Sequence, residues 1–247
     1  MARAYNFGAG PATLPEEILK EAQAELLDYR GTGISILESS HRSKEYDAVH
    51  NEAIANIRSL LALPDDFEVL FIQGGASLQF ALAPMNLLGE GQAADYVHSG
   101  SWAGKAIKEA GKLGQVHLAA DVSGEQPARM PAAEELDLTP GAAYLHLTSN
   151  ETIGGIQWKT FPEVEAPIVC DMSSDILSRP LDPAPFGLIY AGAQKNLGPA
   201  GVAVVLVRKD LLDRAPKTLP TMMQYRTYAE KNSLFNTPPC FAIYLIQ

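Results

Sequence analysis

The sequence predicts an α/β protein with a mainly parallel sheet covered by helices on both faces. Two helical segments open the chain, and short apolar runs then alternate with helical or glycine-rich segments. Strands that are apolar throughout are typical of parallel sheets that are buried on both sides. The 247 residues allow a large domain with a substantial core.

Helical periodicity predicts both opening helices. Residues 15–30 begin with Pro15 in a first-turn position, and residues 44–63 form the second helix, which Pro64 ends. The apolar stripe of the first helix is Leu19, Ala22, Leu26 and Leu27, and that of the second is Tyr46, Val49, Ala53, Ile57, Leu60 and Leu61.

The apolar runs predict about seven strands. They are residues 68–72, 94–98, 115–120, 143–148, 167–172, 188–193 and 202–207. Ligands of an open parallel sheet bind outside the carboxyl ends of its strands. The polar residues that follow these runs are therefore the candidates for a functional site.

Charge and composition exclude several classes of protein. With 19 Lys and Arg against 29 Asp and Glu, the net charge is −10, which disfavours nonspecific nucleic-acid binding. No apolar stretch approaches the ~20 residues that cross a bilayer, and the N-terminus lacks the apolar centre of a signal peptide, so we expect a cytoplasmic protein. Cys170 and Cys240 are too few for a disulfide framework or a four-cysteine zinc site, and the histidines show no metal-ligand spacing.

A glycine-rich turn follows the strand at 68–72. Gly74, Gly75, Ala76 and Ser77 open the next helix, where backbone N–H groups and small residues favour phosphate binding. Such a turn can also simply reverse the chain.

Lys195 directly follows the strand at 188–193, where burial would lower the pKa of its amine and make it a nucleophile toward carbonyls. The alternative is a solvated lysine in a turn. Asp171 ends another strand and can form a salt bridge with Lys195 or lie beneath a heterocyclic cation. A lysine, an aspartate and a glycine-rich turn are together the parts that pyridoxal phosphate requires.

Longer motifs make the interpretation specific. They are NFGAGPATLP, SILESSHRSKEY, QGGASLQF, SGSWAGKA, SNETIGGIQW, CDMSSDILSRP, YAGAQKNLGPAGV and FNTPP. In this order they resemble the phosphoserine aminotransferase family, in the class V branch of the fold-type I pyridoxal-phosphate enzymes. The family is longer at its C-terminus, so the resemblance implies that this chain covers roughly the first two-thirds and lacks most of a small C-terminal domain.

The resemblance implies a role for each matching residue. Lys195 would form the Schiff base and move the substrate proton, and Asp171 would keep the pyridine nitrogen protonated. Trp102 would stack on the ring, and Thr152 would bond its phenolic oxygen. Ala76, Ser77 and Gln194 would hold the phosphate, with Asn236 and Thr237 from the second subunit of a homodimer. Trp102 can instead be a core aromatic, Thr152 a turn cap, and Asn236 and Thr237 part of the turn before Pro238 and Pro239.

Substrate recognition is implied less completely. Arg42 would bind glutamate or the phosphate end of phosphoserine, and His41 is either a second donor or a packing residue. Some family members have an arginine where this chain has Ser77. The family's arginine for the substrate α-carboxylate belongs to the C-terminal region that this sequence lacks. Residues 1–15 would join the small domain, and residues 16–247 would form the cofactor-binding domain.

The implied activity is the reversible transfer of an amino group from glutamate to 3-phosphohydroxypyruvate, which gives phosphoserine and 2-oxoglutarate. This reaction serves serine biosynthesis, and the family also serves pyridoxine biosynthesis. Two alternatives stay open. One is another class V enzyme, such as an alanine–glyoxylate aminotransferase or a cysteine desulfurase. The other is a cofactor-binding dimerisation module without turnover, because catalysis requires a positioned substrate as well as a cofactor.

Overall fold

Seven strands form one sheet in the computed structural model, which describes residues 3–247. In chain order the strands are β1 (Phe67–Ile72), β2 (Ala93–His98), β3 (Gln115–Asp121), β4 (Leu145–Thr148), β7 (Ile168–Asp171), β8 (Phe186–Gly192) and β9 (Ala203–Arg208). Their spatial order is β1-β9-β8-β7-β4-β2-β3. β9 pairs antiparallel with β1 and β8, and every other pair is parallel. The predicted fold class is confirmed.

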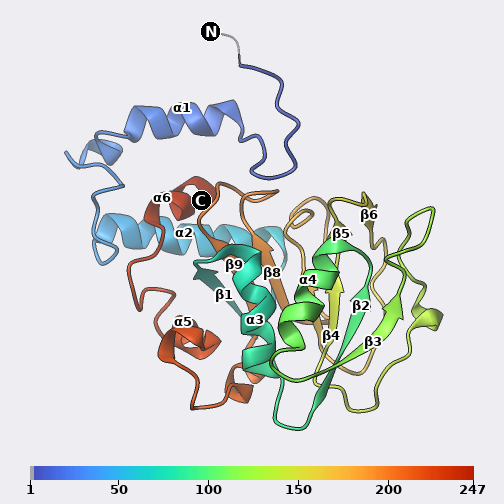
Figure 1. The fold of residues 1–247 in the computed structure, drawn as a ribbon. Helices are drawn as coiled ribbons and strands as arrows, with labels where there is room; N and C mark the ends of the chain where they lie inside the picture. The colour runs from blue at the N-terminus through green and yellow to red at the C-terminus, as the bar shows by residue number, and fades with distance from the viewer. Residues whose placement is uncertain (1–2) are drawn as a thin grey trace.

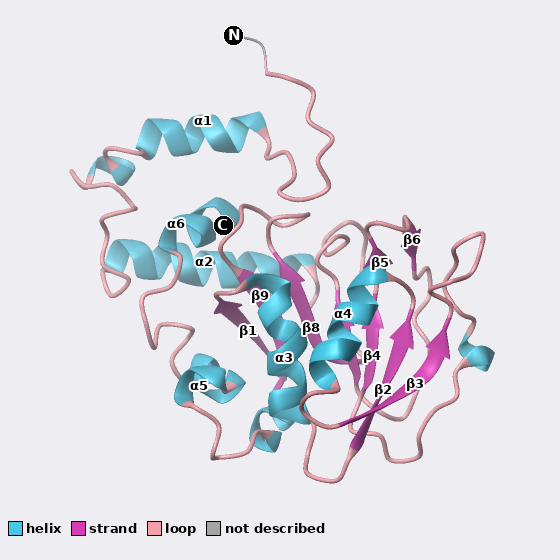
Figure 2. Ribbon diagram, in the orientation of Figure 1, coloured by secondary structure: helices cyan, strands magenta, loops and turns pink. Residues whose placement is uncertain are grey.

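Helices cover both faces of this sheet (Figures 1 and 2). The α-helices within residues 3–247 are α1 (Glu16–Glu25), α2 (Lys44–Leu60), α3 (Gly75–Leu87), α4 (Ser101–Ala110), α5 (Tyr225–Glu230) and α6 (Cys240–Ile246). A separate hairpin pairs β5 (Asn150–Glu151) with β6 (Ile156–Gln157). Helices α3 and α4 lie on the face seen in front in Figure 1, and α2 lies behind β1 and β9.

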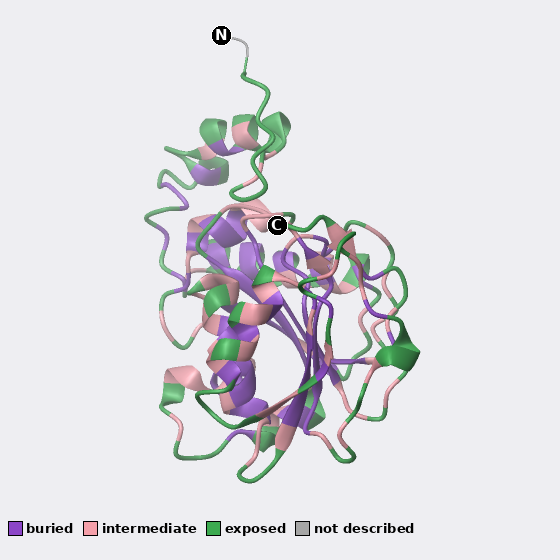
Figure 3. Cartoon of the chain, turned by 45° about the vertical axis from the view of Figure 1, so that its right-hand side comes forward, coloured by how far each residue is buried: buried purple, intermediate pink, exposed green. Residues whose placement is uncertain are grey.

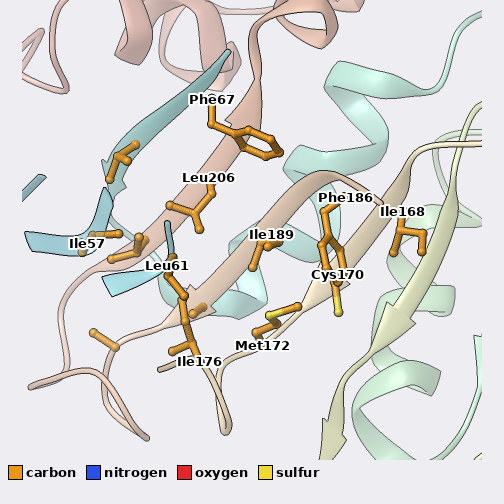
Figure 4. Close-up of a cluster of buried hydrophobic side chains, with 14 of the residues drawn as sticks. Ile57, Leu61, Phe67, Ile168, Cys170, Met172, Ile176, Phe186, Ile189 and Leu206 are labelled. Atoms are coloured by element: carbon orange, nitrogen blue, oxygen red, sulfur yellow. The ribbon is translucent and has the colours of Figure 1, made fainter. Parts of the chain in front are cut away.

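The core lies on both faces because successive side chains of each strand point to opposite sides. On β8, Leu188 and Tyr190 join the cluster that includes Phe80 of α3, whereas Ile189 joins the cluster that includes Ile57 of α2. Figure 4 shows part of the cluster that includes Ile57 and Ile189, and Figure 3 shows the buried strands between exposed outer surfaces. This two-sided burial explains why the strands are apolar throughout.

Helix α2 agrees closely with its prediction. Ser43 caps its start by accepting a hydrogen bond from the Tyr46 backbone N–H at 3.2 Å. Five predicted stripe residues are buried, namely Tyr46, Val49, Ala53, Ile57 and Leu61. The sixth assignment was wrong, because Leu60 is 66% exposed. Leu60 and Leu61 are adjacent, so only one of the two can face the sheet.

Helix α1 is shorter than predicted and lies apart from the sheet (Figure 1). It ends at Glu25, and Leu27, which lies in the bend that follows, is 87% exposed, so its place in a buried stripe was wrong. Only Ala22 of this helix is buried, in a small cluster with Tyr29 and Tyr244. The predicted division at residue 15 stays a prediction. Within residues 3–247, no helix combines the length and the apolar character that crossing a bilayer requires.

The contrast at the end of α2 gives a first prediction. Leu61 is 2% exposed and lies in the core cluster, so we expect Leu61→Ala to lower the free energy of unfolding by about 3 kcal/mol. The matched variant Leu60→Ala should change it by less than about 0.5 kcal/mol. Urea unfolding monitored by circular dichroism measures both, and equal losses would contradict the orientation of the helix.

Candidate active site

A pocket of about 380 Å³ opens at the carboxyl ends of the parallel strands. The loops after β1, β2, β7 and β8 all contribute to it. Its lining residues are Gly74, Gly75, Ala76, Ser77, Trp102, Asp171, Ser173, Gln194, Lys195, Ala200 and Gly201. The structure therefore brings together the glycine-rich turn, the aromatic residue, the acid and the lysine that the sequence indicated. Their individual roles stay predictions.

Lys195 reaches the site from the turn after β8. Its Nζ donates a hydrogen bond to Thr152 Oγ1 at 2.6 Å and lies 4.4 Å from the centre of the Trp102 ring. Burial lowers the pKa of Lys195, the negative charges of Asp171 and Glu151 oppose this shift, and the positive charge of Lys105 adds to it. The net lowering enlarges the neutral, nucleophilic fraction of the amine.

Asp171 is the last residue of β7 and is 5% exposed. Its Oδ1 accepts hydrogen bonds from Ser173 N at 2.9 Å and Ser173 Oγ at 2.6 Å. No donor to Oδ2 is found within residues 3–247. Burial raises the pKa of Asp171, while the Ser173 hydrogen bonds and the charge of Lys195 lower it. A buried carboxylate with a free oxygen beside a pocket fits a ligand that brings a protonated nitrogen.

The glycine-rich turn forms a cradle for an anion. Gly74 and Gly75 adopt positive φ angles of 92° and 61°, which side chains disfavour. Helix α3 begins here without a side-chain cap, so its first-turn N–H groups are available to an anion. At the end of β8, a Cβ at Gly192 would come within 3.3 Å of the Ala76 nitrogen. The residues present thus fit a phosphate group at this end of the pocket.

A buried network fixes the loop that carries Thr152. The Ser149 backbone N–H donates to the Asp171 carbonyl at 2.9 Å, and its hydroxyl donates to Asp175 Oδ1. Gln157 donates to the other Asp175 oxygen at 3.0 Å. Sequence reasoning assigned no role to Ser173 or Asp175. Their proximity to Asp171 in the chain was the available signal.

The N-terminal segment also contacts the site. The Ala12 backbone N–H donates to the Gln194 carbonyl at 2.8 Å. A Cβ on Gly10 would lie only 2.8 Å from Cγ of Lys195, closer than packed carbon atoms approach. The glycine therefore permits the chain to pass directly against the lysine side chain. The motif NFGAGPATLP contained this residue, but its pattern indicated no function for it.

Five predicted residues do not line the pocket. Thr152 is one of them, and it contacts the site through its hydrogen bond from the Lys195 amine. Arg42 is exposed, and His41 is buried in the loop before α2. Asn236 and Thr237 precede α6, where Gln73 Nε2 donates to the Thr237 carbonyl at 3.2 Å. Thr237 borders a neighbouring cavity of about 410 Å³, which shares Ala200 with the candidate site. A single chain thus assembles the residues predicted to hold the ring, but not those predicted to bind substrate or to come from a second subunit.

A larger cavity lies elsewhere. About 880 Å³ in volume, it adjoins the amino ends of β2, β4 and β7, with Asp95, Thr139 and Arg214 among its lining residues. No predicted site residue borders it. Within residues 3–247, no group of three or more His, Cys, Asp or Glu side chains could hold a metal ion.

Comparison with known proteins decides the family. The model of the aminotransferase class-V family matches residues 4–247. The chain belongs to this family. It is 59% identical over 245 residues to a phosphoserine aminotransferase of Niallia circulans, a match that covers 99% of this chain and 68% of the relative. A phosphoserine aminotransferase of Geobacillus kaustophilus is 54% identical, with 68% of its length covered.

Solved structures agree with this assignment. A phosphoserine aminotransferase from Bacillus circulans subsp. alkalophilus superimposes with a TM-score of 0.96 at 59% identity, covering 99% of this chain and 68% of that one. The pyridoxal-phosphate-bound enzyme of Trichomonas vaginalis gives a TM-score of 0.92 at 45% identity, covering 99% and 73%. The resemblance that the sequence motifs indicated is confirmed. An alanine–glyoxylate aminotransferase from Nostoc sp., at 17% identity and a TM-score of 0.72 with 97% and 64% covered, shares the fold alone.

The opposed charges in this class V site predict a pH effect. Because the negative charge of Asp171 raises the pKa of Lys195, Asp171→Asn should lower that pKa further. The pH midpoint for acetylation of Lys195 by acetic anhydride, measured by mass spectrometry, should therefore move to lower pH. Glu109→Gln, on the outer surface of α4, is the control and should leave the midpoint unchanged. An upward movement in Asp171→Asn would contradict the electrostatic assignment.

Proposed function

We propose that the chain is a pyridoxal-phosphate-dependent phosphoserine aminotransferase. It would transfer an amino group reversibly between glutamate and 3-phosphohydroxypyruvate, giving 2-oxoglutarate and phosphoserine, in serine biosynthesis and in the related step of pyridoxine biosynthesis. The observation that carries this proposal is that the amine of Lys195 and the carboxylate of Asp171 line one pocket with an uncapped helix N-terminus. The relatives named above, at 54% to 59% identity, support the substrate assignment.

The residues of the pocket match the parts of this cofactor. When bound, pyridoxal phosphate supplies a carbonyl that takes up the amino group and a ring that accepts the electron pair left on the substrate Cα. Asp171 Oδ2 would hold the proton on the ring nitrogen, and Trp102 would stack on the ring face. The first-turn N–H groups of Ala76 and Ser77, with Gln194, would bind the phosphate.

Lys195 has two tasks in this proposal. Its amine would hold the cofactor through the cofactor carbonyl, and burial favours the neutral, nucleophilic amine by lowering its pKa. With substrate in the site, the free amine would move the proton between the substrate Cα and the cofactor C4′ carbon. Thr152 holds the amine at 2.6 Å in the meantime and would bond the phenolic oxygen of the ring.

Substrate binding and assembly are proposed on sequence motifs. Arg42, with His41, would bind the side-chain carboxylate of glutamate or the phosphate of phosphoserine. We propose a cytoplasmic homodimer in which Asn236 and Thr237 of each chain reach the cofactor phosphate of the other. Neither residue lines the pocket of its own chain, which leaves both available to the pocket of another. Residues 1–15 would belong to the smaller substrate-binding domain of the family.

The two cysteines of this chain do not supply a desulfurase nucleophile. A desulfurase needs a reactive, accessible thiolate. Both Cys170 and Cys240 are buried, and burial raises the pKa of each thiol. Neither cysteine is therefore suited to attack a substrate.

Borohydride trapping tests the cofactor assignment. With pyridoxal phosphate, the protein should absorb visible light, and reduction should attach the cofactor to Lys195, as read by peptide mass spectrometry. Lys195→Met should abolish this labelling, whereas Lys105→Met, which removes the other amine near Trp102 at 4.1 Å, should retain it. Labelling of another lysine in the unaltered protein would refute the proposed site.

Addition of glutamate separates an enzyme from a cofactor-binding module. An aminotransferase should release 2-oxoglutarate and bleach the visible band, and 3-phosphohydroxypyruvate should then restore the band and yield phosphoserine. Glutamate-dependent bleaching without restoration would indicate a half-reaction only. Absence of both changes in a protein that traps the cofactor would favour the dimerisation module.

The close approach of Gly10 gives a further prediction. Gly10→Ala should displace the Lys195 side chain and weaken pyridoxal phosphate binding by about tenfold or more. The matched control is Gly124→Ala, because a Cβ at Gly124 meets nothing within 4 Å and its φ is not positive. Titration of the visible band measures both affinities. Equal affinities for the two variants would show that the N-terminal segment does not constrain the lysine.

A further inference from the structure

A buried carboxylate joins two parts of the site. Glu151, next to Thr152 in the chain, is 1% exposed. Its Oε2 accepts the Trp102 backbone N–H at 3.0 Å, and its Oε1 accepts the Ala103 N–H at 2.9 Å. Ser99 Oγ lies 3.4 Å from Oε1. Both carboxylate oxygens are thus committed to the first turn of α4 and the residues that precede it.

Helix α4 depends on this carboxylate because its own cap residue has no side chain. Gly100 occupies the N-cap position and provides no capping hydrogen bond. A carboxylate at a helix N-terminus both satisfies free N–H groups and interacts favourably with the helix dipole. A Cβ on Gly100 would lie 2.8 Å from Cδ of Glu151, so the glycine is what allows the carboxylate to come this close. Glu151 replaces the missing cap from another part of the chain.

The consequence concerns Lys195. Its Nζ contacts Thr152 at 2.6 Å and the Trp102 ring at 4.4 Å. These two contacts come from different strand ends, and the Glu151 carboxylate connects them, since it adjoins Thr152 in sequence and bonds the backbone of Trp102. We propose that Glu151 is a positioning residue that fixes the Trp102 indole relative to Thr152, so that the indole face and the Thr152 hydroxyl keep one geometry toward an aromatic ring bound in the pocket. This inference rests on the proposed function.

Glu151 also influences the site through its charge, because its carboxylate raises the pKa values of both Lys195 and Asp171. Replacing the charge and shortening the side chain should therefore have different effects. Glu151→Gln keeps the shape and one acceptor oxygen but removes the charge and the second acceptor. Glu151→Asp keeps the charge and both oxygens but withdraws them by one methylene.

The experiment measures cofactor affinity and lysine titration separately. Glu151→Gln should weaken pyridoxal phosphate binding about tenfold and move the pH midpoint for acetylation of Lys195 to lower pH. Glu151→Asp should also weaken binding but leave that midpoint nearer the unaltered one. The control Glu109→Gln, which lies on the exposed side of α4 and pairs with Lys112, should change neither quantity. Near-ultraviolet circular dichroism, with Trp102→Phe as the reference, should show an altered Trp102 signal in both Glu151 variants.

The outcomes distinguish this inference from the proposed function. If Glu151→Gln folds and keeps the affinity, the midpoint and the Trp102 signal of the unaltered protein, Glu151 has no positioning role. If Glu151→Gln fails to fold, an unchanged affinity and Trp102 signal in Glu151→Asp would overturn the inference instead. Failure of the unaltered protein to trap cofactor on Lys195 would refute the proposed function. The Trp102 signal and the acetylation midpoint of the cofactor-free variants would still decide the role of Glu151.

Discussion

The parallel pairing of β7 with β8 is the constraint on which the site depends. Asp171 is the register partner of Tyr190, and the chain that leaves β8 turns back at once to present Lys195. Asp171 and Lys195, which belong to different segments of the sequence, are thereby held at one edge of the sheet. Because both strands are buried on both faces, the spacing between the acid and the amine is set by the core rather than by flexible loops.

Holding these groups out of water has a cost for the cofactor-free protein. Burial raises the pKa of Asp171 and lowers that of Lys195, so each charged form is disfavoured. By linkage, the Asp171 shift removes stability as pH rises from the ordinary aspartate pKa to the raised value. The Lys195 shift restores stability as pH rises from the lowered value to the ordinary lysine pKa. A ligand that pairs with the carboxylate and consumes the amine would relieve both effects, which is why such a site favours cofactor binding.

Apolar patterning predicted all seven strands of the sheet, and their carboxyl ends located Lys195, Asp171 and the glycine-rich turn. Burial on both faces leaves a continuous apolar signal in the inner strands, whereas in the edge strand β3 only Ala119 is buried. The errors at Leu27 and Leu60 arose because periodicity cannot place the edge of an apolar stripe. Glu151 was missed for a different reason. Its partners, Trp102 and Ala103, are 49 and 48 residues away, so only the parallel arrangement of β2 and β4 reveals the contact. Gly10 was missed because the sequence does not show that the Lys195 side chain occupies the space where a side chain at position 10 would lie.

The residues proposed to bind the cofactor lie on different parts of the fold from those proposed to bind substrate or to come from a second subunit. Trp102, Asp171 and Lys195, which are proposed to hold the ring, end or follow strands of the main sheet, and Thr152 follows β5 of the separate hairpin. Glu151, Ser173 and Asp175 join these segments through buried hydrogen bonds. Arg42 and Asn236 instead lie on segments outside that sheet, beside α2 and α6. Buried networks keep the first group in place without a ligand, whereas exposed segments require a further contact to order them. We therefore infer that the fold prepares the proposed cofactor site in advance, whereas the proposed substrate site needs contacts from outside this sheet.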